Sequence, residues 1–371
     1  MKKTMGLKQI NRTVDLVKLL IIIAISLAIV APIIFVASDE PWNALFNFFV
    51  GPFMTLRRFG NILEGACPLI FTALGVMLIF SVGQFSMIAE GAFFIGSIAT
   101  MVVSLVVKLP MGIHALVCLI AAATAGAFAA FIPAALKRKW EVNEVVTSIM
   151  LNYVIQYFGV YLVTYKYGKK ESSAVASEDL AKTSLLPKIL PGTNIHLGLI
   201  VALILCILLW YLLYRTSLGY KLRLTGNNQA FTNYVGVNAP MFMVLAQILG
   251  GAIAGLGGGV ELIGMYRRFK WSASPGYGWT GIVVALLAKD NPLYVPIAAA
   301  FLAYINTGSN VMAMNSDVSN DLASVIQAVI MLLVAANALL ANWKQKLIAE
   351  SAEREEEAAK EIQHSKDEEV Q

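Results

Sequence analysis

Long apolar runs recur along this chain, and most are about as long as a bilayer-spanning helix of roughly 20 residues. Only helices and closed barrels satisfy their backbone polar groups inside a bilayer. The composition agrees, because 58% of the 371 residues are hydrophobic and only 14% are charged. We therefore expect an all-α, polytopic membrane protein. The expected full-length spans are residues 17–37, 62–82, 89–107, 112–136, 145–165, 197–214, 240–265 and 322–340.

Two further spans are expected to be short and broken. The apolar run 279–305 is interrupted by Lys289-Asp290-Asn291-Pro292. This leaves segments of roughly 10 and 14 residues, each short for a full span unless neighbouring helices shield it. Counted separately, the two segments bring the total to about ten transmembrane helices. We expect a transmembrane domain over 17–341, with an N-terminal segment at 1–16 and a charged tail at 342–371.

Basic residues orient these spans. Residues 1–18 hold five Lys or Arg and the single acid Asp15, and Lys137-Arg138-Lys139 lies in a short loop. Such clusters favour the cytoplasmic side, so both termini are predicted to be cytoplasmic. The net charge of +5 is then a consequence of topology in a lipid bilayer, and nucleic acid is not expected as a partner.

The polar stretch 215–238 separates two apolar runs on the predicted cytoplasmic side. Its second half predicts a short helix outside the bilayer. Asn227 or Thr225 can cap the start of this helix, and Ala230 and Tyr234 lie one turn apart on one face. We interpret it as a docking helix for a partner, ended by a left-handed glycine.

Motifs of common catalytic and cofactor sites are missing from the sequence. There is no G-x-x-x-x-G-K-[ST] loop to hold a nucleotide phosphate and no H-E-x-x-H zinc motif. The three histidines are scattered, and the three cysteines fall within apolar runs. We therefore expect no enzyme activity, no cofactor and no metal site, and a transporter of this sequence would need an external source of energy.

Few ionisable residues fall within the expected spans, and they are Glu64, Glu90 and Glu261. A carboxylate is costly in hydrocarbon, so each should face a cavity, a partner or the interface. Two interpretations remain open, a polar path for a substrate and hydrogen bonding between helices. The candidate translocation-path residues are Gln84, Glu90, Asn152, Gln156, Gln247 and Glu261.

Three stretches together carry a resemblance. Residues 141–153, E-V-N-E-V-V-T-S-I-M-L-N-Y, resemble an N-E-V-x-x-x-x-M-L-N-Y signature, and residues 226–236, G-N-N-Q-A-F-T-N-Y-V-G, resemble G-x-N-x-x-A-x-x-x-G. Residues 274–282, S-P-G-Y-G-W-T-G-I, resemble the start of S-P-G-x-G-x-x-G-I-A-V-A-L-L. These signatures are similar to those of permease subunits of bacterial ABC importers for branched-chain amino acids, simple sugars and nucleosides. They look most like the nucleoside branch.

A weaker match covers residues 85–92. This stretch keeps Glu90 and Gly91 but has Ser86, Ile88 and Ala92 where the family usually has Asn, Gly and Gln. If the replaced positions line the permeation path in relatives, their chemistry does not carry over to this chain.

The resemblance implies one half of the transmembrane pathway of an ATP-driven importer in the bacterial cytoplasmic membrane, working by alternating access. Nucleosides are the expected substrates, with simple sugars or branched-chain amino acids as alternatives. The implied partners are cytoplasmic ABC ATPase subunits, a second homologous permease subunit and an extracytoplasmic substrate-binding protein. The ATPase-coupling residues would be Gly226, Asn227, Asn228, Ala230, Tyr234 and Gly236. Outside this class, a secondary transporter with internal repeats and broken helices also fits the pattern.

Overall fold

The computed structural model describes residues 38–169, 175–289 and 291–319, together with positions 32, 34, 35, 321, 323–325, 327–329, 331 and 332. Within these residues the regular structure is helical, and the β-type pairing consists of two isolated bridges in the segment 168–196. The expectation of an all-α fold is therefore confirmed.

Among the described residues, seven helices are long and apolar enough to cross a membrane. They are α3 (Leu56–Phe80), α4 (Ile88–Val106), α5 (Ile113–Trp140), α6 (Glu144–Tyr165), α7 (Gly198–Arg215), α10 (Ala239–Met265) and α12 (Val295–Asn315). The expected count of ten is not confirmed. The expected spans 17–37 and 322–340 fall mostly outside the described residues, as do the segments 1–16 and 342–371.

Of the two spans expected to be short, one is short and the other is not. α11 (Tyr277–Leu287) has 11 residues, but α12 has 21 because the polar sequence after Ile305 continues the helix. Asn310 Nδ2 donates to Asn306 Oδ1 at 2.9 Å, and Asn315 Nδ2 donates to the carbonyl of Val311 at 2.8 Å. Side-chain amides that bond within one helix lose less on leaving water, so hydropathy alone ended this span too early.

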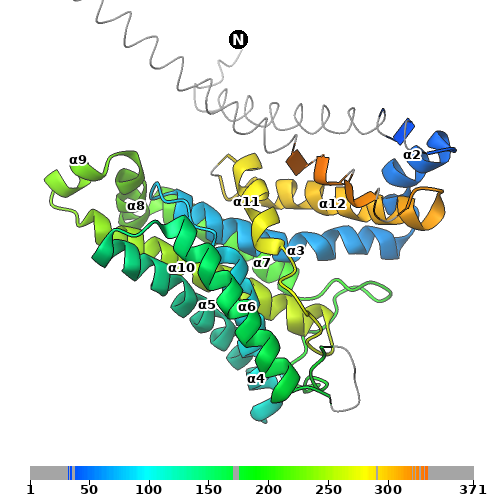
Figure 1. Cartoon of the computed structure of the whole chain (residues 1–371), viewed down its shortest axis with the longest axis horizontal. Helices are drawn as coiled ribbons and strands as arrows, with labels where there is room; N and C mark the ends of the chain where they lie inside the picture. The colour runs from blue at the N-terminus through cyan, green and yellow to red at the C-terminus, as the bar shows by residue number, and fades with distance from the viewer. Residues whose placement is uncertain are drawn as a thin grey trace, which may run out of the picture.

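α10 occupies the centre of the bundle, with α3, α4 and α5 packed against it (Figure 1). Small residues permit this close approach. A Cβ atom added to Gly126 of α5 would meet the carbonyl oxygen of Gly251, and one added to Gly96 of α4 would meet that of Gly255. Helices in lipid associate through such packing, because lipid tails are as apolar as the side chains themselves. The four-residue spacing of Gly251 and Gly255 thus places two helices directly against the centre.

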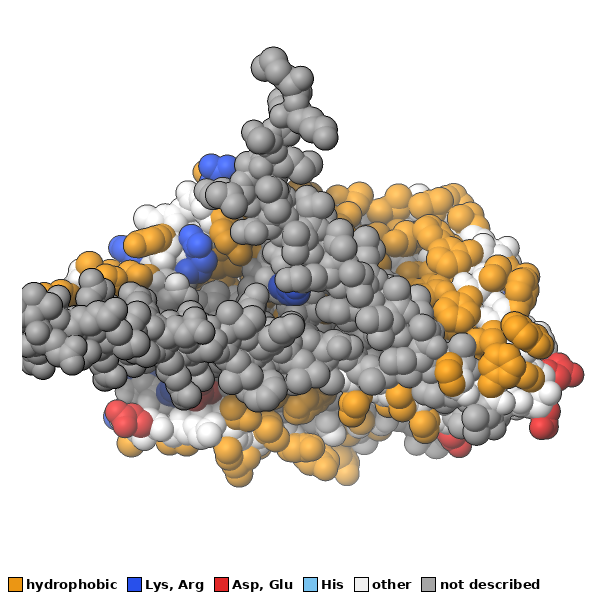
Figure 2. Space-filling view, turned by 90° about the horizontal axis from the view of Figure 1, so that it is seen from above, with side chains coloured by type: hydrophobic (Ala, Val, Ile, Leu, Met, Phe, Trp, Pro, Cys, Tyr) orange, Lys and Arg blue, Asp and Glu red, His pale blue; other side chains and the backbone are white. Residues whose placement is uncertain are grey.

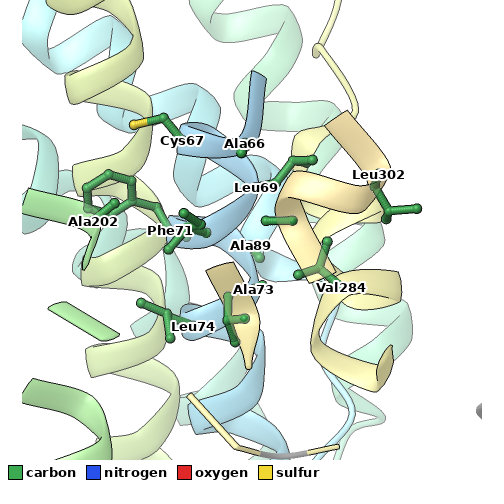
Figure 3. Close-up of a cluster of buried hydrophobic side chains, with 14 of the residues drawn as sticks. Ala66, Cys67, Leu69, Phe71, Ala73, Leu74, Ala89, Ala202, Val284 and Leu302 are labelled. Carbon is green, nitrogen blue, oxygen red and sulfur yellow. The ribbon is translucent and has the colours of Figure 1, made fainter. Parts of the chain in front are cut away.

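A second group of contacts joins α3 to α7, α11 and α12 (Figure 3). Phe71 and Leu74 of α3, Val284 of α11 and Leu302 of α12 are each at most 3% exposed. α3 is the most enclosed of the seven long helices, with 89% of its apolar window buried inside the protein. Its position is therefore set by packing on several sides, which makes it a rigid support for side chains near either end.

The two ends of the long axis carry different short helices (Figure 1). α8 (Ser217–Asn227) and α9 (Gln229–Tyr234) lie at one end, and α2 (Pro41–Phe49) and the 3-10 turn η1 (Gly51–Phe53) lie at the other. On the face seen in Figure 2, hydrophobic side chains cover much of the surface toward the α2 end. Such an apolar exterior suits lipid or another membrane subunit and would be costly in water.

Candidate functional site

A cavity of about 770 Å³ lies between α3, α10, α11 and α12. Its volume falls within the range of small-molecule binding sites. Apolar side chains such as Leu69 and Leu302 share the wall with several polar groups. The polar groups of the wall include Arg57, Arg58, Glu64, Asn194, Glu261 and Asn306. This mixture suits a molecule that has both an apolar face and hydrogen-bonding groups.

Two buried carboxylates stand out in this cavity. Glu64 of α3 is 5% exposed and Glu261 of α10 is 1% exposed, and both line the cavity wall. The Oε2 atom of each is buried and receives no hydrogen bond from the described residues. A buried acceptor without a donor is costly, so a bound molecule or water is expected to supply donors here.

Among the six predicted path residues, Glu261 lines this cavity and the other five do not. Glu90, Asn152 and Gln156 gather where α4 and α6 meet the loop before α11. Gln84 and Gln247 bond to each other, with Gln247 Nε2 donating to Gln84 Oε1 at 3.0 Å. Gln84 also lines a smaller hollow of about 300 Å³ near the start of α10.

Glu90 caps the N-terminus of α11. Its carboxylate accepts hydrogen bonds from the backbone N–H of Gly276 at 2.8 Å, from that of Gly278 at 2.5 Å, and from Ser274 Oγ. The first N–H groups of a helix have no partner within it, and the helix dipole favours negative charge there. Gly276 has φ +81°, a backbone conformation that suits glycine. A Cβ on Gly278 would overlap the backbone of Glu90.

Asn152 and Gln156 of α6 complete this cluster. Asn152 Oδ1 accepts from the N–H of Gly91 at 3.0 Å, and its Nδ2 donates to the carbonyl of Met87 at 2.8 Å. Gln156 Oε1 accepts from the N–H of Ser274 at 3.2 Å. Three stretches far apart in sequence therefore meet at the first turn of α4. These bonds satisfy the buried groups without a substrate, and a role for them in translocation stays a prediction.

The predicted docking helix is α9, but its cap differs from the expectation. Asn228 Oδ1 accepts from the N–H of Phe231 at 2.9 Å, so Asn228 caps α9. Asn227 and Thr225 belong to α8, because the basic stretch before them is helical rather than irregular. Gly236 has φ +82°, which confirms the predicted left-handed end.

α9 presents an apolar surface to its surroundings. Tyr234 is 90% exposed, Val235 54% and Phe231 51%, and Ala230 is exposed beside them. Exposed apolar groups gathered on so short an element are typical of an interaction surface. Of the residues assigned to coupling, Ala230 and Tyr234 thus lie where a partner can reach them.

Gly226 connects this element to the bundle. A Cβ added to Gly226 would overlap the carbonyl oxygen of Ser81 and would lie 3.1 Å from the backbone nitrogen of Gly83. Gly83 itself has φ +72° in the turn between α3 and α4. The end of α8 therefore rests directly on this turn, backbone against backbone.

The sequence interpretation missed the polar side of α12. Asn306, Thr307 and Asn310 line the cavity, as do Leu302 and Ala303 one turn earlier. The sequence carries a signal for this face, because the polar residues Asn306, Thr307 and Asn310 recur at the three- to four-residue period of one helix face. It was overlooked because the span had been ended at Ile305.

The family described as branched-chain amino acid transport system / permease component matches residues 58–335. The chain belongs to this permease family. It is 31% identical over 305 residues to the guanosine ABC transporter permease protein NupP of Bacillus subtilis, covering 80% of this chain and 85% of that one. It is 30% identical over 315 residues to the glucose ABC transporter permease protein TsgB13 of Haloferax volcanii, with 82% and 83% covered.

A third relative is the nucleoside ABC transporter permease protein NupB of Lactococcus lactis, 27% identical over 299 residues, with 78% of this chain and 82% of that one covered. No solved structure matches the chain. The family and the seven apolar helices establish a multi-pass membrane permease of an ABC importer, and the permease is not an enzyme. The resemblance carried by residues 141–153, 226–236 and 274–282 is therefore confirmed.

Proposed function

We propose that this permease forms one half of the pathway of a nucleoside importer in a bacterial cytoplasmic membrane. The observation that carries the proposal is the cavity of about 770 Å³, whose polar and apolar lining suits a molecule with a flat ring and several hydroxyl groups. Relatives named for guanosine and for nucleosides support this substrate class. The relative named for glucose makes a simple sugar the second candidate.

The proposed orientation places α9 in the cytoplasm and the start of α3 outside. Its support is the basic N-terminus, where residues 1–18 hold five Lys or Arg. In this orientation both termini are cytoplasmic. The exposed side chains of Phe231 and Tyr234 face the ATPase subunits, and the cavity end faces a substrate-binding protein. A second, homologous permease subunit completes the pathway.

The proposed mechanism is alternating access, in which α3 transmits movement from the α8–α9 end of the bundle to the cavity. One end of α3 continues into Ser81, against which Gly226 rests, and the other end carries Arg57 and Glu64 into the cavity. With 25 residues at about 1.5 Å each, α3 is roughly 37 Å long. Movement of the ATPases against α9 would therefore be transmitted along a packed helix to the substrate cavity.

Uptake by the assembled importer tests this function. Proteoliposomes that contain the permease with its ATPase subunits, companion permease and binding protein are expected to accumulate labelled guanosine only when ATP is supplied. Excess unlabelled glucose should not compete. Competition by glucose would favour the sugar importer, and uptake by this chain alone, driven by an ion gradient, would refute ATP-driven import altogether.

A further inference from the structure

We infer that Glu64 and Glu261 bind the adjacent hydroxyl groups of the transported molecule and so make the permease selective for ribonucleosides over their deoxy analogues. The inference rests on the proposed function, since it takes the cavity of about 770 Å³ to be the substrate's path. It assigns a ligand group to two residues, of which the sequence interpretation had placed only Glu261 in the path.

The positions and the burial of the two glutamates support this inference. Glu64 projects from α3 and Glu261 from α10, two helices that pack against each other. Both carboxylic side chains line the same cavity. Oε2 of each glutamate is buried and has no hydrogen-bond partner among the described residues. Both glutamates are more than nine-tenths buried. The cavity is therefore lined by two glutamates, each with a buried oxygen atom that has no partner among the described residues.

The charges around the cavity then limit which ligands can donate hydrogen bonds to these two oxygens. Arg57 and Arg58 line the same cavity, so the formal charges of the two arginines and the two glutamates in its described wall cancel. A cationic ligand would gain from the glutamates but would meet the two arginines, and an anionic one would meet the glutamates. No group of three or more His, Cys, Asp or Glu in the described part of the chain could hold a metal ion. A neutral donor of hydrogen bonds fits best.

Hydroxyl groups are the neutral donors that suit a carboxylate. The free Oε2 of Glu64 and that of Glu261 can each accept from one of two neighbouring hydroxyls, and bonds to a charged acceptor are stronger than neutral ones. The 2′ and 3′ hydroxyls of a ribose offer this pair. The remaining wall suits the base, because Leu69, Tyr277 and Leu302 supply apolar surface and the Asn306 amide can both donate and accept.

The experiment compares two substrates in the reconstituted importer. Uptake of labelled uridine and of labelled 2′,3′-dideoxyuridine is measured for the wild type and for Glu64→Gln and Glu261→Gln. Glu178→Gln, the same change at an exposed position outside the cavity, is the matched control. Uridine uptake by each cavity variant should be roughly tenfold or more below that of the wild type. Uptake of the dideoxy analogue should stay within about twofold of the wild-type value, because the analogue has no hydroxyl pair to bind the glutamates. The control should match the wild type.

A further variant separates binding from folding. Glu261→Asp keeps the charge but withdraws the carboxylate by one methylene, and it should also lose uridine uptake selectively. The thermal melting midpoint of each purified variant should stay within a few degrees of the wild-type midpoint, since the unpartnered Oε2 atoms make no hydrogen bond within the protein.

Equal loss for both substrates, or unchanged selectivity in all three cavity variants, would overturn the inference and leave nucleoside transport standing. A wild-type importer that takes up no ribonucleoside would instead overturn the proposed function and the inference together.

Discussion

Glu90 and Glu64 are both buried acids, but their surroundings differ completely. Glu90 accepts three hydrogen bonds from the segment 274–278, whereas Glu64 keeps one oxygen without a donor. A carboxylate with its donors in place holds structure together, and one without them is ready for a ligand. The chemical environment of each residue therefore separates a structural acid from a candidate binding acid.

Replacing Glu90 by Gln should loosen the start of α11. The amide nitrogen cannot accept from a backbone N–H, so at least one of the bonds from Gly276 and Gly278 is lost, at about 1–3 kcal/mol for a buried group. Thermal melting of the purified permease should show a lower midpoint than for wild type. Glu178→Gln again serves as the control. An unchanged midpoint with lost transport would instead support the predicted path role of Glu90.

The permease should become less stable in acid because of His196. Burial and the nearby charge of Lys188 lower the pKa of the His196 imidazole to about 4, from an ordinary value of 6.5. The unfolded chain therefore takes up a proton between pH 6.5 and 4 while the folded chain does not, and stability decreases as the pH falls through that window. From pH 7 to pH 5 the loss should be on the order of 2 kcal/mol.

The comparison of melting midpoints at pH 7 and pH 5 checks this expectation. His196 Nδ1 accepts from the N–H of Gly198 at 3.1 Å, and His196→Asn retains an acceptor but removes the titration. The variant should show a smaller acid shift than the wild type. Equal shifts in both proteins would assign the acid sensitivity to other groups.

Among the helices, α3 is mostly buried by its neighbours and α9 is mostly exposed. α3 is enclosed by other helices, and Pro68 within it has no N–H to donate to the carbonyl of Glu64, four residues earlier. α9 is six residues long and mostly exposed. So short a helix is not stable by itself, and its shape depends on the Asn228 cap and on α8 behind it. An element of this kind can be held firmly by its base while its outer face meets a partner.

Replacing Tyr234 by Asp tests that outer face. The side chain is 90% exposed, so the permease should fold and insert normally, but a charge placed in an apolar contact should reduce uptake by roughly tenfold or more while the ATPases still hydrolyse ATP. The same loss is expected for Ala230→Asp. Normal uptake by both variants would refute the coupling role of α9.

Glu178→Gln, at an exposed loop position outside the cavity, is the control for this test as well, and its uptake should remain close to that of the wild type.

Across the whole molecule, the first half of α3 and the last turn of α10 line the cavity, whereas the opposite ends of these two helices lie near α8 and α9. The exposure of the long helices is uneven. Only 17% of the apolar window of α6 is buried inside the chain, against 89% for α3. The exposed part of α6 must therefore be covered by lipid or by another subunit.

Much of the fold was predictable because an apolar run of this length has one economical solution in a bilayer, the helix, which bonds its own backbone. The end of α12 was not, because the amides of Asn310 and Asn315 find partners inside the helix that a hydropathy pattern does not register. The docking helix was predictable from Gly236 and the local spacing, whereas its cap depended on how far α8 extends.

By itself, the sequence determined the membrane class, the helical architecture and the permease family, since these depend on local hydrophobicity and on contiguous motifs. Only the tertiary structure decided what each buried acid does. Glu90 meets donors more than 180 positions away in the chain, and Glu64 and Glu261 come together across two packed helices around a cavity. A buried carboxylate has its hydrogen bonds only where packing brings donors within about 3 Å of it. The local sequence around the carboxylate does not determine those distances.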